Sequence, residues 1–372
     1  MEDNLKTIAF YLPQFHAIPL NDKYWGKGFT EWENVKKSKS LFKGHIQPEV
    51  PLNKNYYNLL DDNTQIYQAE IAKEYGVDGF CYYHYWFSGE LLLEKPMENM
   101  LQNKKIDIPF CCCWANEHWS KNWDGQPNNI IMKQNYNENE EEWKKHYEYL
   151  SPFFHDERYI KKGNMPLFII YKPYLMSNCQ GMLEFWNALA KAEGFDGIYF
   201  GYQYPDSFRH NTDGFNFGIE FEPLFSLSYG EIESKTRFQK VLYSLVHWNY
   251  GLKKIKNSIK FNWRRFTGKP MIYNYDEVWK SIISRPLSKN VMPGAFTAWD
   301  NTPRKGNAGT VFFEANPDKF RKYMTALVKK VKGDSEFLFI NAWNEWGEGA
   351  HLEPDEYNKF GYLESLKKAL NN

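Results

Sequence analysis

Short, almost continuously apolar runs recur along the chain and are rich in β-branched and aromatic residues. They lack the apolar–polar alternation of a half-exposed strand, so they indicate parallel strands that are buried on both faces. The predicted strands are residues 7–12, 79–85, 108–114, 166–171, 197–202, 215–221, 292–299 and 337–343.

Helical patterns fall between several of these runs. Residues 64–75 and 183–193 each place apolar side chains on one face and stop at a glycine that can cap the helix. A third helix begins with Asn316 as its N-cap, has proline at the first helical position and stops at Gly333. Helices therefore alternate with strands over much of the sequence.

Alternating helices and buried parallel strands predict an α/β fold, a (β/α)8 TIM barrel. The alternative is an open doubly wound sheet, but residues 11–16 (YLPQFH) do not resemble the glycine-rich phosphate loop that this fold needs after its first strand. Segments 13–55, 115–165 and 222–291 are long and are expected to form loops at the C-terminal face of the barrel. No Ser/Gly-rich linker interrupts the sequence, so we expect residues 1–372 to form a single domain.

Charge and composition narrow the function. The formal net charge is zero, from 46 basic and 46 acidic side chains, and no long Lys/Arg run occurs, which argues against nucleic-acid binding. No apolar run reaches the roughly 18 residues of a membrane span, and the N-terminus lacks the pattern of a signal peptide. The chain has five cysteines, and three of them are consecutive at 111–113, where we interpret them as small strand residues. We therefore expect no disulfide framework and a cytoplasmic location. We also expect no metal or other cofactor.

Aromatic residues make up 18% of the chain, with 14 Trp, 26 Tyr and 28 Phe. Tyr and Trp suit half-hydrated surfaces, because one end of each side chain is apolar and the other is polar. Sugar rings have apolar C–H faces and hydroxyl edges, so such side chains fit them, although an aromatic-rich core would give the same composition. The composition therefore leaves both interpretations open.

Polar residues that directly follow barrel strands are the candidates for chemistry. They are Gln14 and His16 after the first strand, and segments 82–86, 114–119, 299–304 and 343–349 at the ends of four others. No zinc-type HExxH or HxxxH spacing and no GxSxG nucleophile motif occurs, so we favour hydrogen bonding to sugar hydroxyls for His16, His84 and His118, which could converge on one pocket.

The strongest candidates are Glu345 and Glu348 in the segment WNEWGEG, residues 343–349. Glycosidic chemistry needs one protonated and one ionised carboxyl group, and proximity beside indole rings pushes two carboxyl pKa values apart. Residues three apart on a straight strand point to opposite faces, so the pair can act together only if the chain turns, which Gly347 and Gly349 permit.

Glu117 is an alternative partner for Glu345. It also follows an asparagine at the end of a predicted strand, and many retaining glycosidases use two glutamates from different strands. A substrate-hydroxyl ligand, or a salt-bridge partner of a loop lysine, would explain Glu117 as well.

Six segments together resemble the WbsX-type proteins, a glycoside hydrolase family 99-like group of bacterial polysaccharide (O-antigen and capsule) biosynthesis clusters. They are residues 9–16 (AFYLPQFH), 25–32 (WGKGFTEW), 79–86 (GFCYYHYW), 113–119 (CWANEHW) with 299–304 (WDNTPR), and 341–354 (NAWNEWGEGAHLEP). The resemblance runs from about Ile8 to Leu363 and implies a (β/α)8 barrel. Family 99 enzymes are retaining endo-α-mannosidases.

Carried over, the resemblance implies that Glu345 is the base that assists attack by the 2-hydroxyl of the sugar, and that Glu348 is the general acid and then base. The intermediate would be a 1,2-anhydro sugar. The expected partner is an oligosaccharide or polysaccharide substrate, which we expect to contact polar and aromatic side chains near the strand ends. These are Tyr11, Gln14, His16, Trp32, Tyr83, His84, Trp86, Trp114, Asn116, Glu117, Trp119, Tyr171, Gln203, Tyr275, Trp299, Asn344 and Trp346.

Two other functions compete with an endo-acting α-glycoside hydrolase. A glycosyltransferase that uses a nucleotide sugar often has a DxD motif, and none occurs here. A glycan-binding protein on an inactive enzyme fold would not need both glutamates, which are present. The sequence does not specify the sugar, the linkage or the oligomeric state.

Overall fold

The computed structural model describes residues 5–121, 126–136, 139–204, 212–229 and 268–371. Residues 230–267, which belong to the predicted connection 222–291, therefore lie outside the described part of the chain.

One parallel sheet forms the centre of the molecule, in the order β12-β10-β9-β8-β4-β2-β1-β15-β13. The strand bounds are β1 (Lys6–Tyr11), β2 (Gly79–Phe87), β4 (Phe110–Trp114), β8 (Met165–Ile170), β9 (Tyr199–Tyr204), β10 (Phe217–Glu220), β12 (Val291–Met292), β13 (Gly294–Phe296) and β15 (Phe337–Asn341). Every predicted strand is present, and the (β/α)8 barrel is confirmed. The open doubly wound sheet is excluded, because β1, the first strand of the predicted set, pairs with β15, the last strand, as well as with β2.

The barrel closes through a strand that the sequence predicted as one piece, residues 292–299. In the structure Pro293 divides it into β12, which pairs with β10, and β13, which pairs with β15. Proline has no N–H group for the ladder, but its carbonyl still accepts from Phe339 N at 3.1 Å. Gly294 is needed at the junction, because a Cβ there would lie 1.7 Å from Glu220 O.

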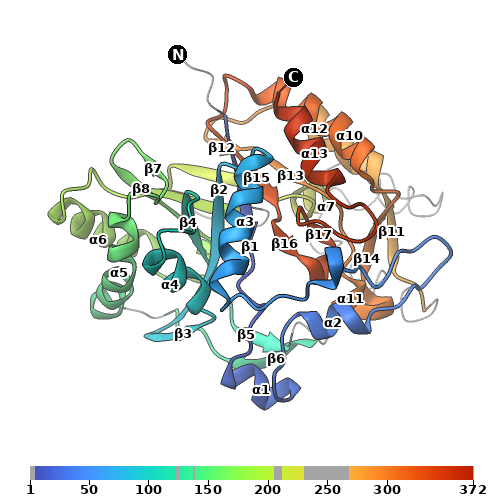
Figure 1. Ribbon diagram of the computed structural model, residues 1–372. Helices are drawn as coiled ribbons and strands as arrows, with labels where there is room; N and C mark the ends of the chain where they lie inside the picture. The colour runs from blue at the N-terminus through green and yellow to red at the C-terminus, as the bar shows by residue number, and fades with distance from the viewer. Residues whose placement is uncertain (1–4, 122–125, 137–138, 205–211, 230–267, 372) are drawn as a thin grey trace, which may run out of the picture.

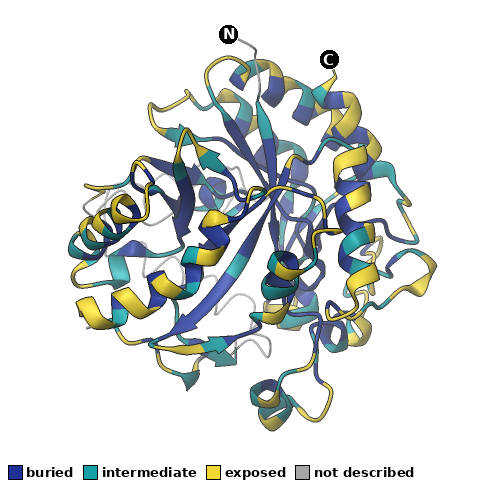
Figure 2. Ribbon diagram, turned by 60° about the vertical axis from the view of Figure 1, so that its left-hand side comes forward, coloured by how far each residue is buried: buried dark blue, intermediate teal, exposed yellow. Residues whose placement is uncertain are grey.

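Helices surround the sheet, and their buried faces turn toward it (Figures 1 and 2). The longer ones are α3 (Asp62–Glu74), α4 (Lys95–Gln102), α5 (Glu140–His155), α6 (Cys179–Ala192), α10 (Tyr275–Ser284), α12 (Pro317–Val331) and α13 (Gly361–Leu370). All three predicted helices are confirmed as α3, α6 and α12. The glycines that follow them, Gly76, Gly194 and Gly333, have φ of +89°, +90° and +85°.

Short elements lie in the predicted long loops and in the connections after β2 and β13. Several lie beyond the C-terminal ends of the barrel strands, toward the bottom of Figure 1, so they surround that face of the barrel. The short elements are α1 (Pro19–Trp25), α2 (Trp32–Lys37), β3 (Glu90–Leu92), β5 (Trp119–Lys121), β6 (Gln126–Met132), β7 (Lys161–Lys162), α7 (Leu224–Tyr229), β11 (Met271–Asn274), α11 (Thr302–Lys305) and β14 (Thr310–Phe313).

The core fills the barrel and the space under the helices. Cys111, Cys112 and Cys113 are fully buried in β4, as their interpretation as small strand residues requires. The thiol of Cys112 lies 3.3 Å from the hydroxyl of Tyr159, which is also buried. These cysteines therefore belong to the packed scaffold beneath the strand ends.

Candidate active site

The chain turns sharply after β15, where both predicted catalytic glutamates lie. β16 (Asn344–Glu345) pairs with β17 (Ala350–His351) as an antiparallel hairpin, and a single 3-10 turn, η6 (Trp346–Glu348), joins them. The side chain of Asn344 bonds Leu12 N at 2.7 Å and Leu12 O at 3.0 Å. The bend that the sequence required is present, and Asn344 anchors it to the end of β1.

The guanidinium of Arg304 binds both glutamates of this turn. Its Nη2 donates to Glu345 Oε2 at 2.8 Å, its Nη1 lies 2.7 Å from Glu348 Oε1, and its Nε donates to Glu31 Oε1 at 2.9 Å. The distance between the bound carboxylate oxygens of Glu345 and Glu348 cannot exceed the lengths of these two contacts plus the distance between the two guanidinium nitrogens. That limit is inside the roughly 9.5 Å that carboxyl pairs of glycosidases span at most.

The two glycines of the turn have different roles. Gly349 has a φ of +58°, a left-handed conformation that favours glycine. Gly347 is needed for space, because a Cβ there would lie 2.0 Å from Glu31 Oε1 and 2.7 Å from Arg304 Nε. The backbone at Gly347 therefore passes close to the Arg304–Glu31 ion pair.

Burial and like charges hold a proton in this cluster. Burial raises the pKa of Glu345 to about 8; Arg304 opposes the rise, and the carboxylates of Glu348 and Glu31 add to it. Burial also raises the pKa of Glu31, again against the effect of Arg304. Although burial disfavours its charge, Arg304 has a pKa well above its ordinary value, because three carboxylates face it. Around neutral pH the cluster therefore combines a permanent cation with a Glu345 carboxyl group that retains a proton.

Glu345 and Glu348 line a cavity of about 400 Å³ at the C-terminal face. Its wall combines aromatic side chains with the polar groups of Lys172, Lys305 and His118. The aromatic residues in the wall are Tyr83, Tyr85, Trp119, Tyr171, Phe221 and Trp299. A cavity of this size, with acid and base groups at one side and aromatic rings around it, suits one or a few sugar rings.

Glu117 lines the same cavity but lies in a different ion pair. Its Oε2 is 2.6 Å from Nζ of Lys172, the residue that follows Tyr171 at the end of β8. The structure thus shows the salt bridge to a loop lysine that the sequence offered as an explanation for Glu117. Among the described residues, Arg304 joins Glu345 to Glu348 and to Glu31, whereas Glu117 pairs with Lys172.

Strand alternation decides which predicted residues reach the cavity. On β2, Tyr83 and Tyr85 line it, whereas His84 and Trp86 point to the other side of the sheet. There His84 Nε2 lies 2.8 Å from Nε2 of His146 on α5, and Trp86 stacks on the same ring at 4.5 Å.

Of the residues predicted to bind substrate, Gln14, Tyr83, Glu117, Trp119, Tyr171 and Trp299 line the cavity. Two others support it, because Gln203 Nε2 donates to the hydroxyl of Tyr83 at 3.3 Å and Asn344 fixes the turn. The structure places the remaining ones away from the wall: Tyr11, His16, Trp32, His84, Trp86, Trp114, Asn116, Tyr275 and Trp346.

These remaining residues have structural contacts. The hydroxyl of Tyr11 donates to the side chain of Gln68, and the hydroxyl of Tyr275 donates to the backbone carbonyl of Thr297. Trp32 and Trp346 pack on each other with ring centroids 5.4 Å apart. Asn116 bonds both backbone polar groups of Lys172, and Trp114 packs edge-on against His146.

The three histidines do not converge. His118 lines the cavity and its Nδ1 accepts from Gln134 N at 2.9 Å. His84 faces α5, and His16 is buried, which lowers its pKa to about 4. Both are therefore held neutral inside the protein, away from the cavity wall.

Sequence reasoning missed Glu31, Arg304, Lys172 and Tyr85. Glu31 and Arg304 are inside segments 25–32 and 299–304, which carry the family resemblance, but neither residue was chosen as a site residue. Both are buried, with side-chain exposures of 0% and 10%. The available signal was a pair of opposite charges next to strand ends, but nothing in one sequence pairs residues that are 273 positions apart.

Two further properties concern the described part of the chain. It contains no group of three or more His, Cys, Asp or Glu side chains placed to hold a metal ion. It also contains no helix that is both long and apolar enough to span a bilayer.

Comparison with known proteins gives a family and a fold. The family model described as "Glycosyltransferase WbsX" matches residues 7–366. A Xanthomonas campestris pv. campestris (strain B100) protein described as "Uncharacterized protein WxcX" is 33% identical, and the match covers 98% of this chain and 49% of that protein. This chain thus spans about half the length of the curated relatives that it matches.

Two solved structures share the barrel over almost their whole length. One, a "Glycoside hydrolase-like protein", has a TM-score of 0.61 at 12% identity, covering 99% of this chain and 94% of its own. The other, the GH99 endo-alpha-mannosidase from Bacteroides thetaiotaomicron, has a TM-score of 0.54 at 13% identity, covering 100% and 96%. At these identities the likeness establishes the fold.

Proposed function

This chain belongs to the WbsX family, and we propose that it is a carbohydrate-active enzyme that cleaves an α-glycosidic bond within a bacterial polysaccharide and retains the anomeric configuration. The observation that carries the proposal is the pair Glu345 and Glu348, bound to one guanidinium in a turn that faces an aromatic cavity. The similarity of the barrel to that of a GH99 endo-alpha-mannosidase supports an α-linked substrate.

The reaction would proceed in two steps. In the first, the Glu345 carboxylate takes the proton of the sugar's 2-hydroxyl, O2 attacks C1, the bond from C1 to the leaving oxygen breaks, and Glu348 protonates that oxygen. The product of this step is a 1,2-anhydro sugar. In the second, the Glu348 carboxylate takes a proton from water, the water oxygen attacks C1, the bond from C1 to O2 breaks, and Glu345 returns its proton to O2. Two displacements at C1 retain the configuration.

The Arg304 cluster fits the proton count of this scheme. The pair must start each cycle with one proton, on Glu348, and with Glu345 ionised. In the free protein a proton is favoured on Glu345, whose pKa is about 8. Because Arg304 contacts both carboxyl groups, the proton can be redistributed within one coupled pair as a sugar displaces water from the cavity. The high pKa also makes the Glu345 carboxylate a stronger base once it is ionised.

Substitution of each glutamate tests the assignment. We expect Glu345→Gln and Glu348→Gln each to lower the cleavage rate about 10²- to 10⁴-fold on an α-linked bacterial polysaccharide that the wild-type protein cleaves. Glu364→Gln, at an exposed position on α13, is the matched control and should keep full activity. NMR of the first product should show the α-anomer. Full activity of either active-site variant, or a β-configured first product, would refute the mechanism.

Glycosyl transfer is the second candidate, and the family's description as a glycosyltransferase favours it. The same two glutamates would then pass the sugar to an acceptor hydroxyl in place of water. Calorimetry with nucleotide sugars separates the two functions: saturable binding that Glu345→Gln or cavity-wall substitutions weaken would support a sugar-nucleotide-dependent transferase. Cleavage of polysaccharide without any nucleotide sugar would support hydrolysis.

A further inference from the structure

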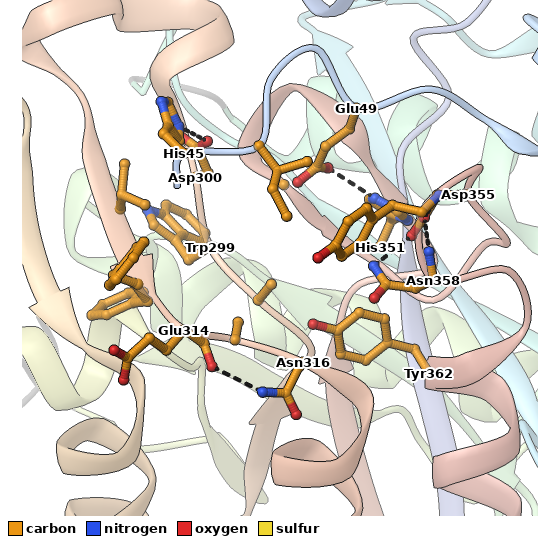
Figure 3. Close-up of a pocket in the computed structure, with 18 of the residues that line it drawn as sticks. His45, Glu49, Trp299, Asp300, Glu314, Asn316, His351, Asp355, Asn358 and Tyr362 are labelled. Carbon is orange, nitrogen blue, oxygen red and sulfur yellow. Dashed lines mark hydrogen bonds and ion pairs between the residues drawn. The ribbon is translucent and has the colours of Figure 1, made fainter. Parts of the chain in front are cut away.

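A second, larger cavity lies next to the proposed active site. Its volume is about 560 Å³, and it is lined by the loop after β1, the segment after β13, strand β14, the hairpin after β15 and the start of α13 (Figure 3). Trp299 lines both cavities. The backbone N–H of Asp300, in the wall of the larger cavity, donates to Glu348 O at 2.6 Å. The two cavities therefore meet at Trp299, and the backbone of the proposed general acid, which lines only the smaller cavity, is bonded to the wall of the larger one.

The lining of this larger cavity is acidic. It includes five carboxylates and no lysine or arginine; the acidic residues are Glu49, Asp300, Glu314, Asp355 and Glu356. Its two histidines are already paired with carboxylates, His45 Nε2 with Asp300 at 2.6 Å and His351 Nε2 with Glu49 at 2.9 Å. A phosphate, a nucleotide or a uronic acid would meet like charge here. Carboxylates accept hydrogen bonds, so they favour a ligand that donates many.

Aromatic groups and one unpaired hydroxyl complete the cavity. Trp299, Phe312 and Phe313 lie along one side, and Tyr357 is 71% exposed. Tyr362 is only 7% exposed, and among the described residues no hydrogen bond to its hydroxyl is found. Figure 3 shows this hydroxyl pointing into the cavity. A buried polar group that lacks a partner inside the protein is satisfied by a ligand or by water.

We propose that this cavity is a second binding site, for a neutral saccharide. Glu49 and Glu314 each contact another described residue through one carboxylate oxygen, so sugar hydroxyls can donate to the other. They also offer both a donor and an acceptor to the hydroxyl of Tyr362, and the C–H face of a sugar ring packs on an aromatic side chain such as Tyr357. The volume is within the range of roughly 300–1,000 Å³ that ligand sites occupy. This proposal rests on the proposed function, because it assumes that the protein handles glycans.

The experiment separates binding here from binding and turnover in the active site. The protein carries Glu345→Gln and Glu348→Gln, which leave the larger cavity unchanged and stop turnover. Affinities are measured by saturation-transfer NMR with mannose, glucose, galactose and N-acetylglucosamine, with glucuronate and glucosamine as charged counterparts. Tyr357→Ala removes an exposed ring and Tyr362→Phe removes only a hydroxyl, so neither requires repacking of the core.

We expect Tyr357→Ala to weaken binding of at least one neutral sugar about tenfold, and Tyr362→Phe to weaken it about threefold to tenfold. Tyr67→Ala, at another exposed tyrosine, should change nothing. Glucuronate should bind more weakly than glucose in every protein. Equal affinities in all variants, or preferential binding of glucosamine or glucuronate in the larger cavity, would overturn the proposal.

The outcomes keep this proposal distinct from the proposed function. Loss of neutral-sugar binding in Tyr357→Ala supports the second site even if the wild-type protein cleaves no polysaccharide. Conversely, polysaccharide cleavage that Glu345→Gln abolishes, together with sugar binding that Tyr357→Ala and Tyr362→Phe leave unchanged, supports the proposed function and refutes the second site.

Discussion

Replacing Glu31 by glutamine would change the protonation of Glu345 without changing its contacts. The substitution keeps the oxygen that accepts from Arg304 Nε at 2.9 Å and removes the negative charge. Burial is the main cause that raises the pKa of Glu345 to about 8, but the charge of Glu31 also raises it. We therefore expect the pKa of Glu345 to fall in Glu31→Gln.

The size of this fall follows from the geometry. Glu31 and Glu345 bond neighbouring nitrogens of one guanidinium at 2.9 and 2.8 Å, so their carboxylates lie close together. Two unit charges ~6–8 Å apart interact by roughly 2–3 kcal/mol at an effective dielectric constant of ~20. After partial relaxation of the site, the expected fall in the pKa of Glu345 is about one to two units.

Carbon-13 NMR of glutamate-labelled protein measures this pKa without a substrate. The Glu345 carboxyl resonance is assigned by its loss in Glu345→Gln, and its shift is followed against pH. Glu33→Gln, a more exposed position on α2, is the matched control and should leave the titration of Glu345 unchanged. A Glu345 midpoint that stays the same or rises in Glu31→Gln would refute the coupling through Arg304.

The same variant has a predicted effect on stability. A carboxyl group whose pKa is raised on folding stabilises the folded state below its unfolded pKa of 4.5, and this stability is lost as the pH rises through about 8. The unfolding free energy at pH ~4 exceeds that at pH ~9 by an amount that should be roughly 1.5–3 kcal/mol smaller in Glu31→Gln than in the wild-type protein. Urea unfolding at the two pH values measures it, and an unchanged difference would contradict the expected linkage.

Three other changes test the surroundings of the site by urea unfolding. Gly347→Ala puts a Cβ 2.0 Å from Glu31 Oε1, so it should destabilise the protein by about 1–3 kcal/mol; a neutral effect would show that the turn relaxes freely. The buried carboxylate of Glu353 accepts from Trp346 Nε1 at 2.6 Å, and Glu353→Gln replaces this carboxylate by an amide. The unfolding free energy should fall by about 1–3 kcal/mol, and an unchanged value would show that water replaces the lost contact. Burial and a neighbouring histidine lower the pKa of His146. The unfolding free energy should therefore fall by up to ~1.4 kcal/mol per pH unit as the pH drops below ~6.5. His146→Phe should reduce this dependence on pH.

The fold was predictable because its strands are buried on both faces. Continuous apolar runs such as 166–171 and 337–343 identify parallel strands without any knowledge of their partners. Because these strands are apolar throughout, the sequence does not indicate which of their side chains point toward the cavity. In segment 82–86 every residue is aromatic or histidine, so no polarity marks which of them face the barrel end; the structure turns Tyr83 and Tyr85 toward the cavity and His84 toward α5.

The turn after β15 was predictable for a different reason. Two glutamates and two glycines within residues 343–349 are costly in a buried strand end unless the chain bends there. What the segment does not contain is its counterion. Arg304 reaches the turn from α11 and Glu31 from the start of α2, so the contacts that fix the protonation of Glu345 come from loops remote in sequence.

The Arg304 cluster is better suited to holding a proton than to stabilising the fold. A single buried cation among three carboxylates leaves an excess of negative charge, and a buried ion pair often contributes little net stability even when its charges balance. Arginine cannot lose its own proton, so any proton that the cluster releases or takes up must belong to a carboxyl group. The arrangement confines proton exchange to Glu31, Glu345 and Glu348, and of these both Glu345 and Glu348 face the cavity. Two carboxyl groups that share a proton beside a bound sugar are what the proposed two-step cleavage requires.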